Sequence, residues 1–158
     1  MSNEEIKELI SSNLPTATFD ETGEWLNVII DSKDWSKFAV FCKNEALQLD
    51  YLFCLTCIDW KTHLTMVYHL SSTKYRHNIV VKANVDNNNP EIDTVCNIWR
   101  TAEFHEREVF EMFGVNFLNH PDLRNLILED ETAGAVDEKK GYNPLRKDFE
   151  DPINMIKL

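Results

Sequence analysis

A histidine and three carboxylates stand within one short stretch of the sequence, at His105, Glu106, Glu108 and Glu111. Imidazole and carboxylate groups bind metal ions and transfer protons, so this stretch could form a metal centre or an acid–base site. The alternative is that the charges hold the chain to itself or to a neighbouring protein. The choice depends on which faces of the local helix carry them.

The surrounding residues have the spacing of an amphipathic helix that ends at Gly114, a residue typical of the C′ position. Projected at about 100° per residue, the apolar line consists of Ala102, Val109 and Phe113. The opposite arc carries Glu103, Arg107, Glu108 and Glu111. We therefore expect most of this charge on a solvated or partner-facing surface, with a favourable i, i+4 ion pair between Glu103 and Arg107.

Glu106 differs from its neighbours because it projects close to the apolar line, where burial is expected. A buried carboxylate needs a cation or several hydrogen-bond donors. We expect that partner to be an arginine: Arg124, Arg146 or one from another chain. His105 lies on the other border of the apolar arc, and no second histidine follows at i+4, so the H-E-x-x-H zinc motif is absent. A structural or interface role is favoured over acid–base or metal chemistry.

The remaining candidate metal ligands are dispersed. Cys54 and Cys57 form a C-x-x-C within an apolar strand-like run, where residues three apart point to opposite faces. With Cys42 and Cys96 they are expected to be free thiols, and no cluster or zinc site is predicted. His63 and His69 share one strand face but lie about 20 Å apart, so they cannot bind one ion.

Composition and charge exclude several classes of protein. The chain has 158 residues and a formal net charge of −11, whereas nucleic-acid binding needs clustered Lys and Arg. No apolar run approaches the roughly 20 residues of a membrane-spanning helix. The N-terminal stretch MSNEEIKELI lacks the layout of a signal peptide, so a location in the cytosol, or on the cytosolic side of a membrane, is expected.

The order of the expected elements predicts an α+β fold. A first helix has a capping box at Ser2 and Glu5, two short strands follow within residues 17–31, and a second helix runs from about residue 31 to Leu49. Three strands are expected at 51–59, 63–71 and 75–85. We expect helices on one face of a largely antiparallel or mixed sheet of about five strands, within a globular domain spanning residues 1–118.

Residues 119–158 differ from the preceding domain. They contain three prolines and two glycines, and no periodic pattern extends beyond about two turns. So long an irregular stretch is uncommon inside a compact domain. Short apolar groups recur in it, including Leu126, Ile127 and Leu145. We interpret 119–158 as an irregular, extended C-terminal strap that docks onto another protein.

Two parts of the sequence are distinctive as motifs. Residues 105–128 read HEREVFEMFGVNFLNHPDLRNLIL, and residues 144–149 read PLRKDF. Together they closely resemble the signature of the thirty-kilodalton subunit (the C subunit) of proton-pumping NADH–quinone oxidoreductase, respiratory complex I. The matching positions expected at structural or partner interfaces are Glu106, Arg107, Glu108, Phe113, Gly114, His120, Pro121, Asp122, Arg124, Pro144, Arg146, Lys147, Asp148 and Phe149. Asn119 replaces a glycine of the family pattern, and asparagine tolerates left-handed backbone well.

The resemblance implies a non-catalytic structural subunit in the peripheral, quinone-reducing arm. It would pack against the large quinone-site subunit (the forty-nine-kilodalton or D subunit) and near the subunit with the terminal iron–sulfur cluster, on the cytoplasmic side of a bacterial membrane. Flavin and clusters would belong to those partners, with no cofactor, metal or catalytic residue in this chain. The equivalent subunit of a ferredoxin- or F420-linked complex or of a membrane-bound hydrogenase stays open, as does a stand-alone acid–base enzyme.

Overall fold

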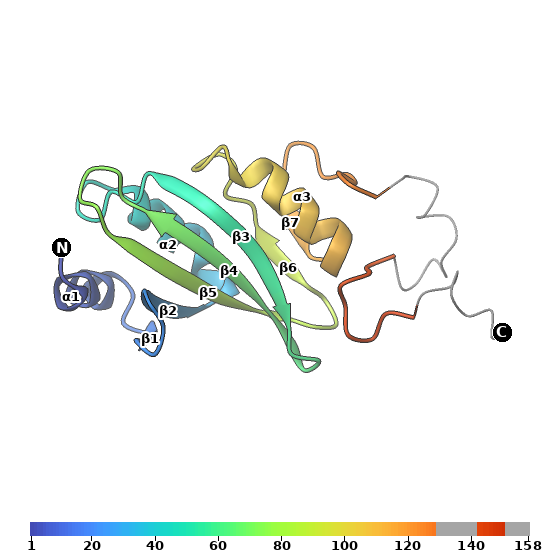
Figure 1. Cartoon of the computed structure of the whole chain (residues 1–158), viewed down its shortest axis with the longest axis horizontal. Helices are drawn as coiled ribbons and strands as arrows, with labels where there is room; N and C mark the ends of the chain where they lie inside the picture. Colours follow the sequence, from blue (N-terminus) through green and yellow to red (C-terminus); the bar gives the residue numbers. More distant parts are fainter. Residues whose placement is uncertain (129–141, 151–158) are drawn as a thin grey trace.

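The computed structural model describes residues 1–128 and 142–150, which form three α-helices and two β-sheets (Figure 1). The helices are α1 (Asn3–Asn13), α2 (Trp35–Lys43) and α3 (Ala102–Phe113), and a 3₁₀ turn, η1 (Ser32–Asp34), precedes α2. The strands are β1 (Thr18–Asp20), β2 (Leu26–Asp31), β3 (Tyr51–Asp59), β4 (His63–Ser71), β5 (Asn78–Asp86), β6 (Glu91–Asp93) and β7 (Asn116–Leu118). The predicted α+β class is confirmed.

The main sheet has five strands in the order β1-β2-β5-β4-β3. Strands β3, β4 and β5 form the expected antiparallel meander, β1 pairs antiparallel with β2, and β2 pairs parallel with β5. The sheet is therefore mixed. Its core side buries alternate residues of each strand, as period-2 alternation requires. On β4 these residues are Leu64, Met66, Tyr68 and Leu70.

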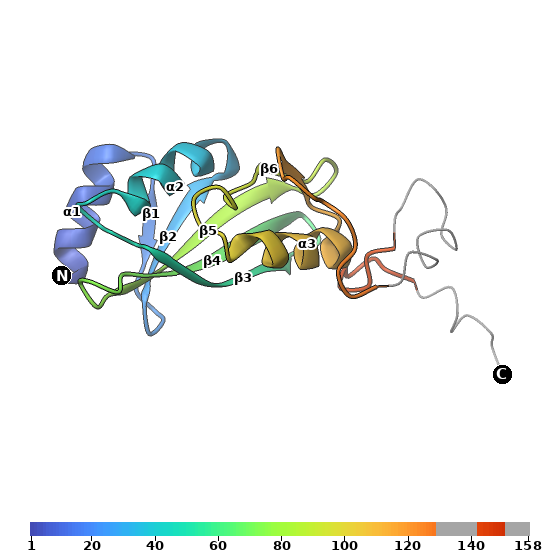
Figure 2. The same cartoon turned by 90° about the horizontal axis from the view of Figure 1, so that it is seen from above.

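The three helices contribute to one core on that side of the sheet. Ile6 and Ile10 of α1, Trp35 of α2 and Val109 of α3 belong to the same buried cluster as the core-facing strand residues. Figure 2 shows α1 and α2 on the same side of the sheet. The Ser2 capping box is present, because the Ser2 hydroxyl accepts from Glu5 N–H and the Glu5 carboxylate accepts from Ser2 N–H. Helix α3 packs against β3. This packing determines which of the charged residues of α3 face the neighbouring segments.

Two predicted element boundaries are wrong. Helix α2 ends at Lys43 rather than near Leu49, because the Asn44 side chain accepts from Ala46 N–H and begins a turn. Leu47 and Leu49 still reach the core from this irregular stretch. Strand β5 starts at Asn78 rather than at residue 75, since Arg76 has φ +57° and closes a turn onto Ser72.

The second sheet was not predicted. Strands β6 and β7 have three residues each and pair in parallel, with Ile92 beside Phe117. Such short strands show too little alternation to be recognised in a sequence. This small sheet places the residues just after β6 against α3. The predicted alternation of the two strand cysteines is confirmed, because Cys57 faces the core and Cys54 lies outside the core cluster, and no disulfide joins any of the four cysteines.

The buried position of Leu70 predicts that Leu70→Ala strongly lowers the stability of the fold. Leu70 is fully buried in β4, so truncation leaves a cavity and should lower the free energy of unfolding by about 2–5 kcal/mol. Val40→Ala is the matched control, because Val40 is exposed on α2, and it should change stability by less than about 0.5 kcal/mol. Urea unfolding followed by tryptophan fluorescence measures both. Equal effects of the two variants would contradict this core assignment.

Candidate functional site: the buried charges of helix α3

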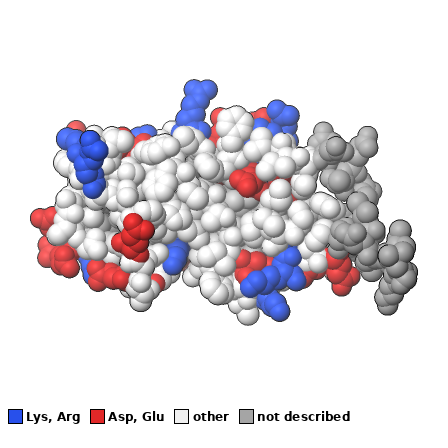
Figure 3. Space-filling model, viewed as in Figure 1, with Lys and Arg blue, Asp and Glu red and all other residues white. Residues whose placement is uncertain are grey.

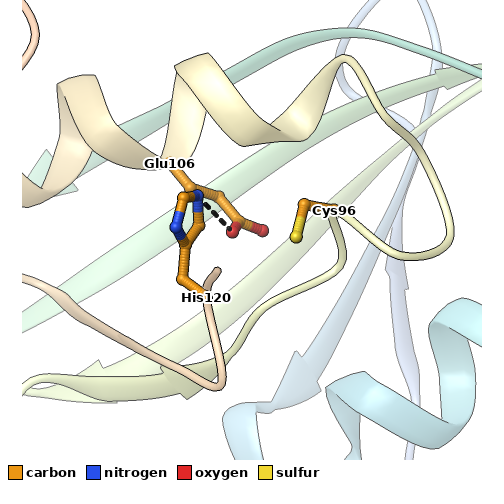
Figure 4. A group of neighbouring side chains, drawn as sticks. All are labelled: Cys96, Glu106 and His120. Atoms are coloured by element: carbon orange, nitrogen blue, oxygen red, sulfur yellow. Dashed lines mark ion pairs between the residues drawn. The ribbon is translucent and has the colours of Figure 1, made fainter. Parts of the chain in front are cut away.

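Glu106 lies at the junction of three segments and is completely buried. Its Oε1 accepts from Val95 N–H at 2.8 Å, and its Oε2 accepts from the Thr94 hydroxyl. The His120 Nε2 atom lies 3.8 Å from the same Oε2 (Figure 4). Glu106 therefore joins α3 to the end of β6 and to the turn that follows β7.

Burial dominates the acidity of Glu106. Removal from water raises the pKa of this carboxyl, the bonds from Thr94 and Val95 partly offset the increase, and the pKa is about 7. Expecting Arg124 or Arg146 as its partner was wrong: Arg124 pairs with Asp122, and Arg146 lies 3.7 Å from Asp59. Helical projection indicated burial but could not show that a backbone amide and a hydroxyl would supply the donors.

Cys96 joins Glu106 and His120 in a group whose ligand atoms all lie within 4.8 Å of one another (Figure 4). Thiolate, imidazole and carboxylate are ligand types that zinc accepts. The hydrogen bonds of the ring oppose that use: His120 Nδ1 accepts from Asp122 N–H at 3.0 Å, which places the ring proton on Nε2. Nε2–H donates to the Glu103 carbonyl at 3.0 Å, so metal coordination would break both bonds. We interpret the group as a hydrogen-bonded junction.

Arg107 is buried within the chain, against the expectation of a solvated or partner-facing surface. Its Nε donates to the Arg124 carbonyl at 3.0 Å and its Nη2 to the Asn125 carbonyl at 2.7 Å. The guanidinium thus binds main-chain oxygens of the segment after β7. The predicted ion pair between Glu103 and Arg107 is not formed within the described residues, where Asp122 is the carboxylate paired with Arg107. The projection failed here because it treats the helix without the segment that covers it.

Glu111 is the second charge that the projection misplaced. Its carboxylate is buried and accepts from three successive amides, those of Leu126 at 2.9 Å, Ile127 at 2.9 Å and Leu128 at 3.1 Å. Arg107 and Glu111 stand one helical turn apart on the same face of α3, so both reach the segment 124–128. Arg107 binds carbonyls of this segment, and Glu111 binds its amides. We call this arrangement, Arg107 and Glu111 with the main chain of 124–128, the α3 clamp.

The C-terminal end of α3 carries the second motif. Gly114 has φ +74° as expected of a C′ residue, and a Cβ at this position would lie 2.7 Å from Asn143 Oδ1. The Asn143 side chain donates to the Glu111 carbonyl at 3.0 Å, and Leu145 N–H donates to the Met112 carbonyl at 3.1 Å. Residues 142–150 thereby satisfy carbonyls that the helix end leaves free.

Asp59, at the end of β3, fixes the rest of this motif. Its Oδ2 accepts from Lys147 N–H at 2.9 Å and lies 3.7 Å from Arg146 Nε. Hydrogen bonds from Lys147 and Lys61 amides, with the charge of Arg146, hold the pKa of Asp59 below its usual value against the opposing effect of burial. Sequence reasoning missed Asp59, because nothing in a strand-end aspartate indicates which distant segment it meets.

The other predicted interface residues are less enclosed. Phe113 is buried in the core, whereas Glu108, Pro121, Asp122, Arg124, Lys147 and Asp148 are exposed, and Pro144 and Phe149 are partly buried. Phe149 packs edge-on against Tyr142 at 5.0 Å between ring centroids. Asn119 has φ +65°, the left-handed backbone that asparagine was expected to tolerate at this position.

Comparison with known proteins identifies the family. The sequence profile described as "Respiratory-chain NADH dehydrogenase, 30 Kd subunit" matches residues 28–153. The chain belongs to this family. It is 33% identical over 127 residues to the C subunit of NADH-quinone oxidoreductase from Geotalea uraniireducens, a match that covers 78% of this chain and 72% of that protein.

Other relatives of the thirty-kilodalton family differ in length and complex. The C/D subunit of NADH-quinone oxidoreductase from Phocaeicola vulgatus is 41% identical over 116 residues, which cover 72% of this chain but only 21% of that protein, so the chain spans about a fifth of it. The C subunit of F(420)H(2) dehydrogenase from Methanosarcina mazei is 33% identical over 120 residues, covering 75% of this chain and 72% of that protein.

Solved structures share the fold of this thirty-kilodalton-family chain. A chain of an archaeal membrane-bound sulfane sulfur reductase, described as a respiratory membrane complex, aligns with TM-score 0.75 and 26% identity, over 95% of this chain and 86% of that one. A trypsin-resistant fragment of Nqo5 aligns with TM-score 0.65 and 24% identity, over 75% of this chain and 96% of the fragment, and supports the fold alone. Within residues 1–128 and 142–150, no helix has the length and hydropathy to cross a membrane.

The raised pKa of Glu106 predicts a pH dependence of stability. A carboxyl whose pKa is higher in the folded chain stabilises the fold below its ordinary pKa of 4.5, and this contribution is lost as pH rises through about 7. Glu106→Gln keeps an acceptor for Val95 N–H without the ionisation. Its stability relative to the unsubstituted chain should therefore rise by up to about 3 kcal/mol between pH 4.5 and 8.

Chemical unfolding of both proteins across this pH range measures the difference. Glu108→Gln is the control, because Glu108 is exposed on the same helix and its removal should leave the two stability curves parallel. Parallel curves for Glu106→Gln would show that Glu106 does not titrate as argued.

The α3 clamp predicts a local effect of Glu111→Gln. The amide side chain lacks the charge and one of the two acceptor oxygens, so the bonds to Leu126, Ile127 and Leu128 weaken. Amide hydrogen exchange at residues 126–128 should accelerate about tenfold or more, as expected when bonds to a charged acceptor are lost. Mass spectrometry of the exchanged peptides measures it, with exchange in β4 as the internal reference. Unchanged exchange at 126–128 would contradict the clamp.

Proposed function

We propose that this chain is a structural subunit of the peripheral, quinone-reducing arm of a proton-translocating NADH–quinone oxidoreductase. It supports electron transfer from NADH to quinone without carrying catalytic residues or a cofactor. Family membership across residues 28–153 supports the setting. The junction at Glu106 supports the structural role, because Glu106 and His120 are engaged in hydrogen bonds to Thr94 and to main-chain groups of the chain itself.

The observation that carries the proposal is the way in which the α3 clamp holds apolar residues outward. Arg107 and Glu111 fix the backbone of 124–128, while Leu126 is 39% exposed and Ile127 is 62% exposed. Leu145, held through its own amide on α3, is 55% exposed. Apolar side chains on a fixed backbone lose little conformational freedom on binding, so such a surface favours docking to a protein.

The partners that we assign are the large quinone-site subunit and the subunit that holds the terminal iron–sulfur cluster. Relatives whose names join the letters C and D support the first, since the two units form one polypeptide there. The complex would hold this chain on the cytoplasmic face of a cell membrane as a peripheral component. The division into a domain at 1–118 and a partner-docking strap at 119–158 stays part of this proposal, and residues 129–141 and 151–158 lie outside the described chain.

A second candidate is the equivalent subunit of a related respiratory complex. The 33% identity to the F(420)H(2) dehydrogenase relative equals that to the Geotalea uraniireducens relative, so identity does not separate the two. The electron donor would bind to other subunits in either case. The input subunits that accompany the native chain therefore discriminate: a flavin-containing NADH-oxidising unit supports the first candidate, and an F420-oxidising unit supports the second.

The test is affinity purification of the tagged chain from gently solubilised membranes of its own organism. We expect it to recover a large complex that contains the large quinone-site subunit and iron–sulfur subunits and reduces quinone with NADH. Ile127→Asp should reduce recovery of those subunits at least tenfold, because an uncompensated charge enters an apolar contact. Val40→Asp, on the exposed side of α2, should leave recovery unchanged. Recovery of the chain alone, as a monomer, would overturn the proposal.

A further inference from the structure

The face of the main sheet that points away from the helices carries no described helix, although Trp25 packs edge-on against Phe53 and His69 on it. Strand register places Thr56, Val67, Lys82 and Ile29 in one row across this outer face. Val67 and Val80 lie on this face outside the core cluster, but they are only 5% and 6% exposed, so neighbouring side chains of the chain already bury them. The apolar side chains that stay exposed beside Lys82 on the outer face are Ile58, at 36%, and Trp60, at 53%.

A hollow of about 270 Å³ interrupts this face beside Lys82. Ile29, Ile58 and Trp60 form apolar parts of its lining, and Trp60 is 53% exposed although its indole N–H donates to the Thr65 hydroxyl. The Thr65 hydroxyl in turn donates to Asn84 Oδ1. These bonds fix the polar groups of the lining, so the hollow has a defined shape and an exposed aromatic wall.

Charge is scarce in the middle of the outer face. Figure 1 looks onto it, with α2 behind the strands, and the same view in Figure 3 shows acidic and basic side chains gathered mainly around the edges. Lys82 is the cation of the central row, and no ion pair formed within residues 1–128 and 142–150 includes it. Hydrogen bonds from Thr22 are the main cause that lowers the pKa of Asp20, with a smaller contribution from the charge of Lys82, and the described residues show no ion pair between Asp20 and Lys82. The stem of Lys82 is partly buried on this face, so its ammonium is available to a carboxylate that approaches from outside.

We propose that the outer face docks a neighbouring subunit of the complex, through a mostly uncharged surface that places one carboxylate beside Lys82. Stacking on a sheet face gives a large flat contact, and a single charge pair at its centre fixes the register. This inference rests on the proposed function, because it requires that the chain be part of a complex.

Other occupants fit less well. A second copy docked with its two-fold axis through the central row would bring one Lys82 against the other, which like-charge repulsion opposes. Nucleic acid and anionic membranes require clusters of Lys and Arg, whereas this face has one cation in its central row. A mostly uncharged protein surface with one carboxylate opposite Lys82 is the occupant that fits this face.

The first experiment compares Lys82 in the isolated chain and in the purified complex. An amine-reactive label should modify Lys82 at least fivefold less in the complex, while Lys37, exposed on α2, is labelled equally in both. A zero-length carbodiimide cross-link should then join Lys82 to an Asp or Glu of another subunit. Equal labelling of Lys82 in both states, or a cross-link only to a second copy of this chain, would overturn the proposal.

The second experiment uses substitutions that leave the core intact. Thr56→Arg and Lys82→Glu place a bulky cation or the opposite charge in the central row, and each should lower recovery of partner subunits at least fivefold. Val40→Arg is the control for an added surface charge. Thermal unfolding of each isolated variant checks that folding is unchanged. Normal recovery with both substitutions refutes the outer-face contact, whereas failure of the unsubstituted chain to recover any complex refutes the proposed function itself.

Discussion

Helix α3 can bury Glu106, Arg107 and Glu111 only because the segments around it supply a hydrogen-bond partner for each charge. A buried charge without such partners costs several kcal/mol, so the positions of β6, of the turn at His120 and of residues 124–128 are coupled to these three side chains. The small β6–β7 sheet gains its importance from this coupling. It brings Thr94 and Val95 to Glu106, and its far end leads directly to the segment held by Arg107 and Glu111.

The same helix connects the core to the segments that follow it. One side of α3 belongs to the core, with Val109 and Phe113, while its charged side faces the main chain of the following segment. The end of the helix, at Gly114, receives residues 142–150. Segments from both sequence motifs therefore pack on the same helix, although residues 129–143 separate the motifs in the sequence.

Sequence patterns predicted those features that arise from local rules. Alternation gave β3 and β4 with their correct bounds, the Ser2 capping box gave the start of α1, and the glycine rule gave the end of α3. Burial of Glu106 was also predicted, but its partners were not. Thr94, Val95 and Asp59 could not be found because a backbone amide or a single carboxylate has no pattern of its own. Arg107 and Glu111 were misplaced for a related reason: projection assumes that a charged arc meets water, whereas here it meets peptide groups.

The α3 clamp grips peptide groups rather than side chains. Every bond from Arg107 or Glu111 to residues 124–128 ends on a main-chain oxygen or nitrogen. These bonds to main-chain atoms do not depend on which side chains residues 124–128 carry. Substitution at Leu126 or Ile127 would then alter the outward surface while the local backbone path is preserved. The bonds that fix the backbone therefore involve different atoms from the side chains that face outward. The outward side chains can change to suit a binding partner without loss of those bonds.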